Sequence, residues 1–258
     1  MDQHDAYYAQ LFKHDPVYST PYPNVEEARR WAAIGEYLSR IAASGRHGDC
    51  GALRILDVGC GRGWMTRLAS VYGECHGIDP VDEVVAFART LSPELRFFHG
   101  TIEDLLGSPD FEPYDVVLCS EVIEHVEDKE AFAGGLRACL GPGGHVVLTT
   151  PRGEQFGRYR RSGYDLQPVE EWITERDLEA LFGRHGFRAV RHDRVYDDLP
   201  RMSLLHRLAA SARLTARLDA LGLGWLGKAL RHLAAVYQVW WFEKLPPREG
   251  ATPDRPAA

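Results

Sequence analysis

The sequence contains little cysteine, no long apolar run and no recognisable export signal. Only five of its 258 residues are cysteines, and no two of them have the CxxC spacing typical of zinc and redox sites. Such usage favours a reduced protein over a disulfide framework. The opening segment MDQHDAYYAQLFKHD is polar and contains acids, unlike a secretory or transit peptide. Since no uncharged apolar segment reaches the roughly 18 residues that span a bilayer, we expect a cytoplasmic protein.

A surplus of positive charge is missing as well. The formal net charge is −7 at pH 7, which argues against a general nucleic-acid binder, so no nucleic acid is expected as a partner. The chain also shows neither internal repeats nor low-complexity segments. With 45% hydrophobic residues, a chain of this length can bury one large α/β core, with or without an appendage.

From residue 53 onward, short apolar segments alternate with segments of helical periodicity. The expected strands are LRILDV, ECHGID, LRFFHG, YDVVLCS, HVVLTTP and FRAVRHDRVY. The expected helices are WMTRLASVY, DEVVAFARTL, a segment near 128–140 and TERDLEALFGRH, and the turn GPGG precedes the fifth strand. This alternation predicts a mostly parallel sheet with helices on both faces. Ligands bind such sheets beyond the carboxyl ends of the strands, so the residues that follow each strand are the candidates for a site.

The first part of the chain has a different character. Residues 1–23 are rich in tyrosine, histidine and proline, which predicts an irregular arm with one short helix. Asn24 followed by Glu27 has the spacing of a helix cap, and apolar residues recur beyond it at helical intervals. We therefore expect a helix of about 18 residues after Asn24.

Three glycines follow the first expected strand, in the sequence DVGCGRG. Gly59, Gly61 and Gly63 let the backbone adopt positive φ and approach a ligand closely, and the amides of the next helix favour an electron-rich group. A tight turn alone would explain the same glycines. Trp64 stands where the dinucleotide motif GxGxxG has its third glycine, which weakens an interpretation as a nicotinamide oxidoreductase.

Acidic residues follow the second and third expected strands. Asp79 ends GID, twenty positions after Gly59, where a carboxylate can accept both hydroxyls of a ribose. The alternative is a cap for the following helix, a role for which Asp82 is better placed. In the sequence TIED, Ile102 beside Glu103 suits an adenine ring and its amino group, or simply opens a loop.

The segment SEVIEH after the fourth strand is the one that packing explains least. Glu121, Glu124 and His125 lie within five residues and would be costly to bury without partners, so we expect them to face a cleft. His125 is the candidate general base, because its ordinary pKa near 6.5 suits proton transfer at neutral pH. A capping or hinge role at the following helix is an equally good interpretation of His125.

Taken in order and spacing, the segments ILDVGCGRG, GIDP, GTIEDL, YDVVLCSEVIEHV and LGPGGHVVLTTP resemble the class I S-adenosylmethionine-dependent methyltransferases. Within that family they are most similar to the small-molecule O-methyltransferases of the ubiquinone-biosynthesis type. The resemblance covers roughly residues 50–195. It implies a doubly wound, seven-stranded, Rossmann-like sheet whose final antiparallel strand is YQVWWFEKL, with S-adenosylmethionine as cofactor and S-adenosylhomocysteine as product.

The resemblance also implies roles for individual residues. The implied cofactor-binding residues are Asp57, Gly59, Gly61 and Gly63 at the methionyl part, Asp79 with Pro80 at the ribose, Ile102 and Glu103 at the adenine, and Ser120 beside the sulfonium. In some relatives an ExxEH segment holds a divalent metal, which here would use Glu121, Glu124 and His125. We expect no metal site, because residues 151–173 offer no further histidine.

Segments outside these motifs are expected to choose the acceptor. Between residues 151 and 173, four arginines either grip an anionic group of the acceptor or lie on a solvated loop; they are Arg152, Arg158, Arg160 and Arg161. Residues 201–232 contain six basic residues and one acid, with leucines at helical spacing. That pattern suits a membrane-surface helix, a lid over the substrate or a dimer contact. We favour a fourth interpretation, helices packed on the sheet before its last strand.

These observations divide the chain into five parts. They are an N-terminal arm and helix acting as a substrate lid (1–50), the cofactor-binding core (51–200), a basic helical insertion (201–236), the last strand (237–246) and a disordered tail (247–258). The expected function is methyl transfer to a small molecule, preferably to a hydroxyl oxygen, by a monomer or homodimer. The alternatives are N- or C-methylation, or a cofactor-binding module that engages a membrane or partner through residues 201–232.

Overall fold

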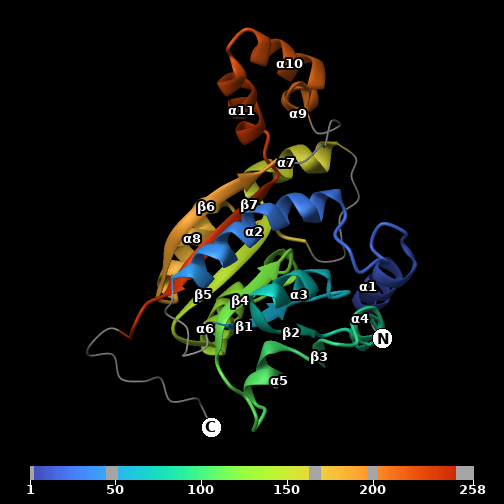
Figure 1. Cartoon of the computed structure of the whole chain (residues 1–258), viewed down its shortest axis with the longest axis vertical. Helices are drawn as coiled ribbons and strands as arrows, with labels where there is room; N and C mark the ends of the chain where they lie inside the picture. The colour runs from blue at the N-terminus through green and yellow to red at the C-terminus, as the bar shows by residue number, and fades with distance from the viewer. Residues whose placement is uncertain (1–2, 45–51, 163–169, 197–202, 248–258) are drawn as a thin grey trace.

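The computed structural model describes residues 3–44, 52–162, 170–196 and 203–247. Its centre is a seven-stranded sheet with the strand order β3-β2-β1-β4-β5-β7-β6 (Figure 1). The strands are β1 (Leu53–Val58), β2 (Gly73–Asp79), β3 (Arg96–His99), β4 (Tyr114–Ser120), β5 (Leu140–Pro151), β6 (Phe187–Val195) and β7 (Tyr237–Lys244). Neighbouring strands from β3 to β5 are parallel, and β7 runs antiparallel to both β5 and β6. The predicted fold class is confirmed, including the antiparallel last strand.

Helices cover both faces of the sheet. The helices of the described residues are α1 (Gln3–His14), α2 (Val25–Ala43), α3 (Trp64–Ala69), α4 (Asp82–Leu91), α5 (Ile102–Leu106), α6 (Lys129–Cys139), α7 (Gly153–Arg161), α8 (Glu175–Arg184), α9 (Leu204–Ala210), α10 (Ala212–Ala220) and α11 (Gly224–Leu233), of which the last three do not cover the sheet. Two short 3₁₀ turns are η1 (Ser70–Tyr72) and η2 (Ile123–His125). Alternate residues of β1 enter different cores: Ile55 packs with α2 and α3, whereas Leu56 packs with α6 and α8. The sheet is therefore doubly wound.

Helix α1 and the start of α2 lie at the edge of the sheet where the parallel strands end, and the rest of α2 packs on a face of the sheet. The side chain of Asn24 accepts from the Glu27 amide while that of Glu27 accepts from the Asn24 amide, which confirms the predicted cap of α2. α1 lies beside α4 (Figure 1), and Lys13 Nζ is 3.0 Å from Glu83 Oε2 across that contact. The expected arm thus contains a helix of three turns that reaches the carboxyl edge of the sheet.

Some local predictions are corrected by the structure. The alternative interpretation of Ile102, that it opens a loop, is wrong, because the reciprocal cap between Thr101 and Asp104 starts the short helix α5 there. The predicted cap at Asp82 is wrong, because α4 begins at that residue and has no side-chain cap. Residues 153–161 form α7 instead of a loop. The turn GPGG does interrupt the strand register, since Tyr114 pairs with Leu140 and Val116 pairs with His145.

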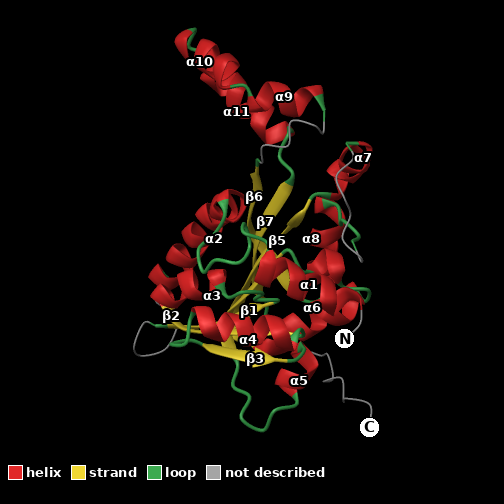
Figure 2. Cartoon of the chain, turned by 90° about the vertical axis from the view of Figure 1, so that its right-hand side faces the viewer, coloured by secondary structure: helices red, strands yellow, loops and turns green. Residues whose placement is uncertain are grey.

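Helices α9, α10 and α11 pack against one another and extend beyond the sheet near one end of β6 and β7 (Figures 1 and 2). We call residues 204–233 the projection. The expectation that these helices pack on the sheet is wrong: an amphipathic pattern indicates a face to cover without specifying what covers it. In the described part of the chain, no helix combines the length and apolarity that crossing a bilayer requires. Apart from Pro247, the predicted disordered tail lies outside the described residues.

Candidate active site

A cavity of about 260 Å³ lies at the carboxyl edge of the sheet. Its walls come from the ends of β1, β2 and β4, from α1 and α2, and from segments beside β5 and β7. The residues that line it include Tyr8, Phe12, Glu26, Glu27, Arg30, Gly59, Gly61, Asp79, Pro80, Val81, Ser120, Glu121, Val122, Glu124, His125, Tyr159, Glu170, Trp172, Val236 and Tyr237. Because parallel strands end at one edge of the sheet, residues distant in sequence meet at this cavity.

Backbone geometry shapes the first side of the cavity. Gly59 and Gly61 have φ values of 68° and 53°, in the left-handed region that favours glycine. A Cβ atom at Gly59 would collide with Val122, and one at Gly61 would lie 3.0 Å from the ring of Phe12 on α1. Both glycines therefore leave room that any other residue would fill.

The carboxylate of Asp79 completes this side. It accepts hydrogen bonds from the Gly61 amide and from the Val81 amide, each at 3.0 Å. The side chain thus fixes the glycine turn of β1 and the start of α4, and it also lines the cavity with Pro80. We call Gly59, Gly61 and Asp79 the glycine wall.

Four of the predicted cofactor residues lie away from the cavity lining. Asp57 is fully buried, and its Oδ2 accepts from the Thr66 hydroxyl at 2.6 Å. Burial raises the pKa of the Asp57 carboxyl to about 7. Gly63 starts α3, where a Cβ atom would lie 2.6 Å from the Phe97 ring. Ile102 packs in the core and Glu103 is exposed on α5, so their predicted contact with adenine stays a prediction.

Side chains that follow β4 form the opposite side. Ser120 Oγ and Thr149 Oγ1 are 2.7 Å apart, and the same Thr149 hydroxyl donates to Glu121 Oε1 at 2.8 Å. Thr150 donates to Glu124 Oε2 at 2.9 Å. Burial raises the pKa of Glu121 to about 8 and that of Glu124 to about 7. Glu121 also has a φ of 58°, a strained conformation for a residue with a side chain.

His125 lies at the end of η2 and lines the same cavity. Its Nε2 atom is 3.9 Å from Glu124 Oε1, and its ring meets the ring of Tyr8 edge-on at a centroid distance of 6.1 Å. We call Ser120, Glu121, Glu124 and His125 the acidic wall. Within the ranges that the structure describes, no group of three or more histidine, cysteine or acidic side chains is arranged to hold a metal ion.

Arg62 is a component of the site that the sequence interpretation missed. Its guanidinium is fully buried within the glycine turn and forms two hydrogen bonds to the Glu27 carboxylate, at 2.8 and 2.6 Å. It also donates to the carbonyls of Thr20 and Tyr22. Arg62 therefore ties the N-terminal arm and α2 to the glycine wall. The sequence did contain a sign of this role, because Arg62 is a basic residue inside an otherwise glycine-rich turn.

Arg30 of α2 is the second missed residue. Its buried guanidinium lies 4.6 Å from the centre of the Tyr237 ring, and its Nε atom is 3.9 Å from Glu121 Oε1. That Nε–H makes no hydrogen bond in the structure. Arg30 thus brings a positive charge to the acidic wall, which lowers the cost of an ionised carboxylate there.

The arginines between residues 151 and 173 are arranged differently from the expectation. Arg152 is buried, with Nη1 donating to the Ala235 carbonyl at 2.9 Å and Nε to Glu175 Oε1 at 2.6 Å, so it holds the chain together instead of an acceptor. The other three are exposed on α7: Arg158, Arg160 and Arg161. The same helix contributes Tyr159, whose ring lies 4.7 Å from that of Trp172 at the cavity.

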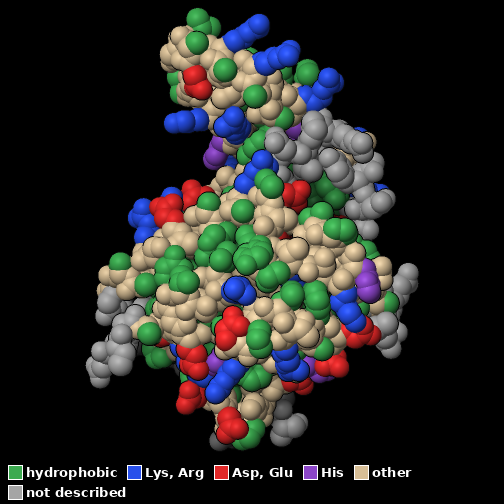
Figure 3. Space-filling view, turned by 45° about the vertical axis from the view of Figure 1, so that its right-hand side comes forward, with side chains coloured by type: hydrophobic (Ala, Val, Ile, Leu, Met, Phe, Trp, Pro, Cys, Tyr) green, Lys and Arg blue, Asp and Glu red, His purple; other side chains and the backbone are tan. Residues whose placement is uncertain are grey.

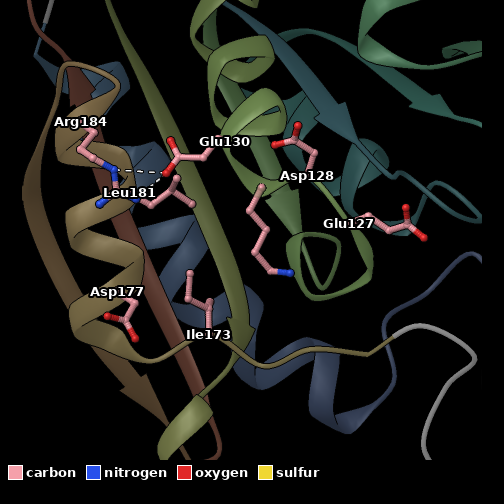
Figure 4. A pocket seen from close by; sticks show the side chains of 8 residues that line it. Glu127, Asp128, Glu130, Ile173, Asp177, Leu181 and Arg184 are labelled. Carbon is pink, nitrogen blue, oxygen red and sulfur yellow. Dashed lines mark hydrogen bonds and ion pairs between the residues drawn. The ribbon is translucent and has the colours of Figure 1, made fainter.

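A second hollow of about 510 Å³ lies between α6 and α8 (Figure 4). Figure 4 shows acidic side chains around it and the ion pair that joins Glu130 to Arg184, 2.6 Å long. Neither glycines of positive φ nor strand ends line this hollow. The cavity between the glycine wall and the acidic wall is therefore the candidate active site.

Comparison with known proteins identifies the family. A family model described as a methyltransferase domain matches residues 25–192, which is more than half of the chain. The chain belongs to this methyltransferase family. The resemblance inferred from the motifs is thereby confirmed. The matched residues include both walls of the cavity.

Curated relatives of this methyltransferase carry more specific names. The ubiquinone biosynthesis O-methyltransferase of Rickettsia canadensis is 34% identical over 120 residues, which are 45% of this chain and 49% of the relative. The mitochondrial enzyme of the same name from Homo sapiens is 36% identical over 106 residues, 38% of this chain and 28% of the relative. The methyltransferase thus matches half or less of the length of these relatives.

Solved structures share the fold at low sequence identity. A S-adenosylmethionine-dependent methyltransferase from Archaeoglobus fulgidus has a TM-score of 0.60 at 18% identity, covering 94% of this chain and all of the other. A magnesium protoporphyrin IX methyltransferase from Synechocystis, solved with bound S-adenosylmethionine, has a TM-score of 0.55 at 14% identity, covering 95% and 98%. The [4+2]-cyclase SpnF reaches 0.58 at 19% identity and covers 94% of each. These likenesses establish the fold of the methyltransferase and leave its acceptor open.

Proposed function

We propose that this methyltransferase moves the methyl group of S-adenosylmethionine to a hydroxyl oxygen of a small molecule. The carbon–sulfur bond of the sulfonium breaks, a carbon–oxygen bond forms, S-adenosylhomocysteine leaves, and a base takes the hydroxyl proton. The observation that carries this proposal is the pairing of walls in one cavity: glycines and a carboxylate on one side, titratable side chains on the other. The O-methyltransferase names of the curated relatives support a hydroxyl acceptor.

The glycine wall fits such a cofactor. Gly59 and Gly61 present backbone without side chains, and Asp79 with Pro80 lies beside them at the cavity. We assign the methionyl part to the two glycines, with Asp57 and Gly63 supporting their turn from behind. The ribose is assigned to Asp79 and Pro80, the adenine to Ile102 and Glu103, and the sulfonium side to Ser120.

The acidic wall supplies what a hydroxyl acceptor needs. Holding the acceptor in line with the sulfonium can contribute about 7 to 11 kcal/mol. A positioned base adds about 10²- to 10⁴-fold more. We assign that base to His125, which lines the cavity near Glu124 and Tyr8. Helix α1 brings Tyr8 and Phe12 to the same cavity, which supports the role of residues 1–50 as a lid over the substrate.

An amine acceptor is the second candidate. Five glutamates line the cavity, namely Glu26, Glu27, Glu121, Glu124 and Glu170, whereas Arg30 is the single arginine or lysine among the lining residues. Such a lining offers many carboxyl oxygens that can accept hydrogen bonds from the N–H groups of an amine. The two candidates differ in their need for a base. A hydroxyl must give up its proton as it attacks, whereas a neutral amine attacks first and loses its proton afterwards.

Release of S-adenosylhomocysteine tests the proposal directly. The enzyme is incubated with S-adenosylmethionine and matched panels of phenols and aromatic amines of equal size, and the methylated product is identified by mass spectrometry. We expect turnover with a phenol, accompanied by an O-methyl product. Turnover confined to amines would replace hydroxyl transfer with amine transfer, and binding of S-adenosylmethionine without turnover on either panel would contradict both.

A further inference from the structure

We propose that the projection is a docking surface for an anionic lipid bilayer. The proposal stands on three features of helices α9, α10 and α11: their apolar exposure, their unpaired positive charge and their place beyond the sheet. None of these features enters the catalytic assignment, so lipid binding is independent of the proposed function.

The projection exposes an unusual share of the apolar surface. Half of the large exposed hydrophobic side chains in the described part of the chain fall in these 30 residues; they are Leu204, Leu208, Leu221, Leu223, Trp225, Leu226 and Leu233. Leu221 is 72% exposed and Trp225 is 65% exposed. Tryptophan and leucine opposite a basic face are typical of helices that lie in the interface of a membrane. Isolated apolar side chains need no explanation, but such a concentration marks an interaction surface.

The charge of the projection is also unusual for this protein. Five cationic side chains are exposed on it, namely Arg207, Arg213, Arg217, Lys228 and Arg231, against the single acid Asp219. Within the described ranges, none of the five forms an ion pair. Figure 3 shows basic and hydrophobic side chains interspersed over the projecting helices. Outside the projection, some exposed arginines do form ion pairs, as Arg40 does with Glu36 and Arg184 does with Glu130.

Charge complementarity selects the bilayer over a second copy of the chain. A symmetric contact between two projections would bring their unpaired cations together, which costs free energy. An anionic bilayer instead attracts each lysine or arginine near its surface by about 1 kcal/mol and accepts the apolar side chains between the headgroups. The overall charge of −7 disfavours contact by the rest of the molecule, so the basic projection would direct the approach.

The projection is connected to the candidate active site by a short stretch of chain. α11 ends at Leu233, and Val236 and Tyr237 already line the cavity. Docking would therefore hold this part of the cavity wall close to the bilayer. If the proposed function is correct, a lipophilic acceptor reaches the acidic wall over the shortest path.

Vesicle co-sedimentation tests the docking surface. The full chain is mixed with phosphatidylcholine vesicles, with or without phosphatidylglycerol, at low and high salt. We expect sedimentation with the anionic vesicles, weakened by salt because exposed charges are screened. In the combined variant Arg213→Gln, Arg217→Gln and Lys228→Gln, we expect a loss of about 100-fold in partitioning, from three cations at about 1 kcal/mol each. Trp225→Ala should weaken the salt-resistant part of binding.

The matched control replaces exposed arginines of the body: Arg40→Gln, Arg184→Gln and Arg188→Gln. This variant removes the same charge from the chain but leaves the projection intact. It should therefore bind anionic vesicles as well as the wild type does. Absence of sedimentation by the folded wild type, or equal loss in both triple variants, would overturn the proposal. A dimer in solution that Trp225→Ala dissociates would assign the surface to a second copy. Because S-adenosylmethionine affinity is measured on the same samples, failure of docking and failure of the proposed function give different results.

Discussion

The two walls of the cavity are built by different means. The glycine wall consists of backbone without side chains and of one carboxylate, Asp79, which two amides hold in place. The acidic wall contains two carboxyl groups, those of Glu121 and Glu124, whose pKa burial has raised, and its backbone is strained at Glu121. In the proposed function, this difference divides the roles: the fixed geometry of the glycine wall binds the cofactor, and the titratable groups of the acidic wall serve proton transfer.

The largest effect is expected from His125 on the acidic wall. His125→Ala should lower kcat by about 10²- to 10⁴-fold, because the acceptor proton loses its base. The affinity for S-adenosylmethionine should stay within about twofold, since the glycine wall is untouched. The control is His185→Ala. This half-buried histidine follows α8, contacts Glu130 of α6 and does not line the cavity. If His125→Ala keeps its turnover but loses affinity for S-adenosylmethionine, His125 binds the cofactor and is not the base.

The next effect concerns the link between the arm and the glycine wall. Glu27→Ala removes the partner of the fully buried Arg62, and an unpaired buried charge costs about 3 to 5 kcal/mol of the free energy of unfolding. Glu36→Ala, which removes the partner of the exposed Arg40, should cost about 1 kcal/mol or less. Urea unfolding measures both. Similar losses in the two variants would show that the Arg62 pair does not anchor the arm.

Glycine substitutions separate close packing from backbone strain. Gly59→Ala places a methyl group against Val122 and adds positive-φ strain, so we expect a loss of about 2 kcal/mol or more together with lost cofactor affinity. Gly143→Ala has the same φ of 68° but open space around its Cβ position, so strain alone should cost about 1 kcal/mol. Equal cofactor affinity in the two variants would remove Gly59 from the site.

A smaller effect appears in the pH dependence of stability. The folded chain raises the pKa of Glu124 to about 7, so it keeps a proton that the unfolded chain loses near its ordinary pKa. Stability from this group is therefore fully present below the unfolded pKa and is lost as the pH rises toward 7. Glu124→Gln should flatten the fall in unfolding free energy between pH 5 and 7, by at most about 1.4 kcal/mol per pH unit. The exposed Glu130→Gln should leave that slope unchanged, and an unaltered slope in Glu124→Gln would contradict the raised pKa.

Much of the sheet was predictable because its local signals agree with its packing. LRILDV, DEVVAFARTL and YDVVLCS coincide with β1, α4 and β4, and the threonine that begins the expected helix TERDLEALFGRH, Thr174, caps α8. α7 was missed because GEQFGRYRR has little apolar periodicity, and α5 because a helix of five residues is set by its cap. The helical spacing of leucines in residues 201–232 predicts an apolar face but not what covers it. The position of the projection could therefore not be predicted from the sequence.

The same reasoning separates the predictable part of the site from the rest. Gly59, Gly61, Asp79, Ser120 and His125 meet at one cavity because each lies at or shortly after the carboxyl end of a parallel strand. Arg62 contacts Glu27 of α2, and Arg30 contacts Tyr237 of β7. These partners lie far away in the sequence, so the spacing of motifs does not reveal either role. Arg152, expected at the acceptor, instead binds Glu175 through a contact of the same kind.

The most direct test of the central claim is calorimetric titration with S-adenosylmethionine and S-adenosylhomocysteine. Asp79→Ala is compared with Asp82→Ala, which removes an exposed acid at the start of α4. Both variants are first shown to be folded. The account predicts micromolar binding of both ligands by the wild type and by Asp82→Ala, and a loss of at least about 10-fold in Asp79→Ala from missing charge-assisted hydrogen bonds. A folded wild type that binds neither ligand would contradict the account.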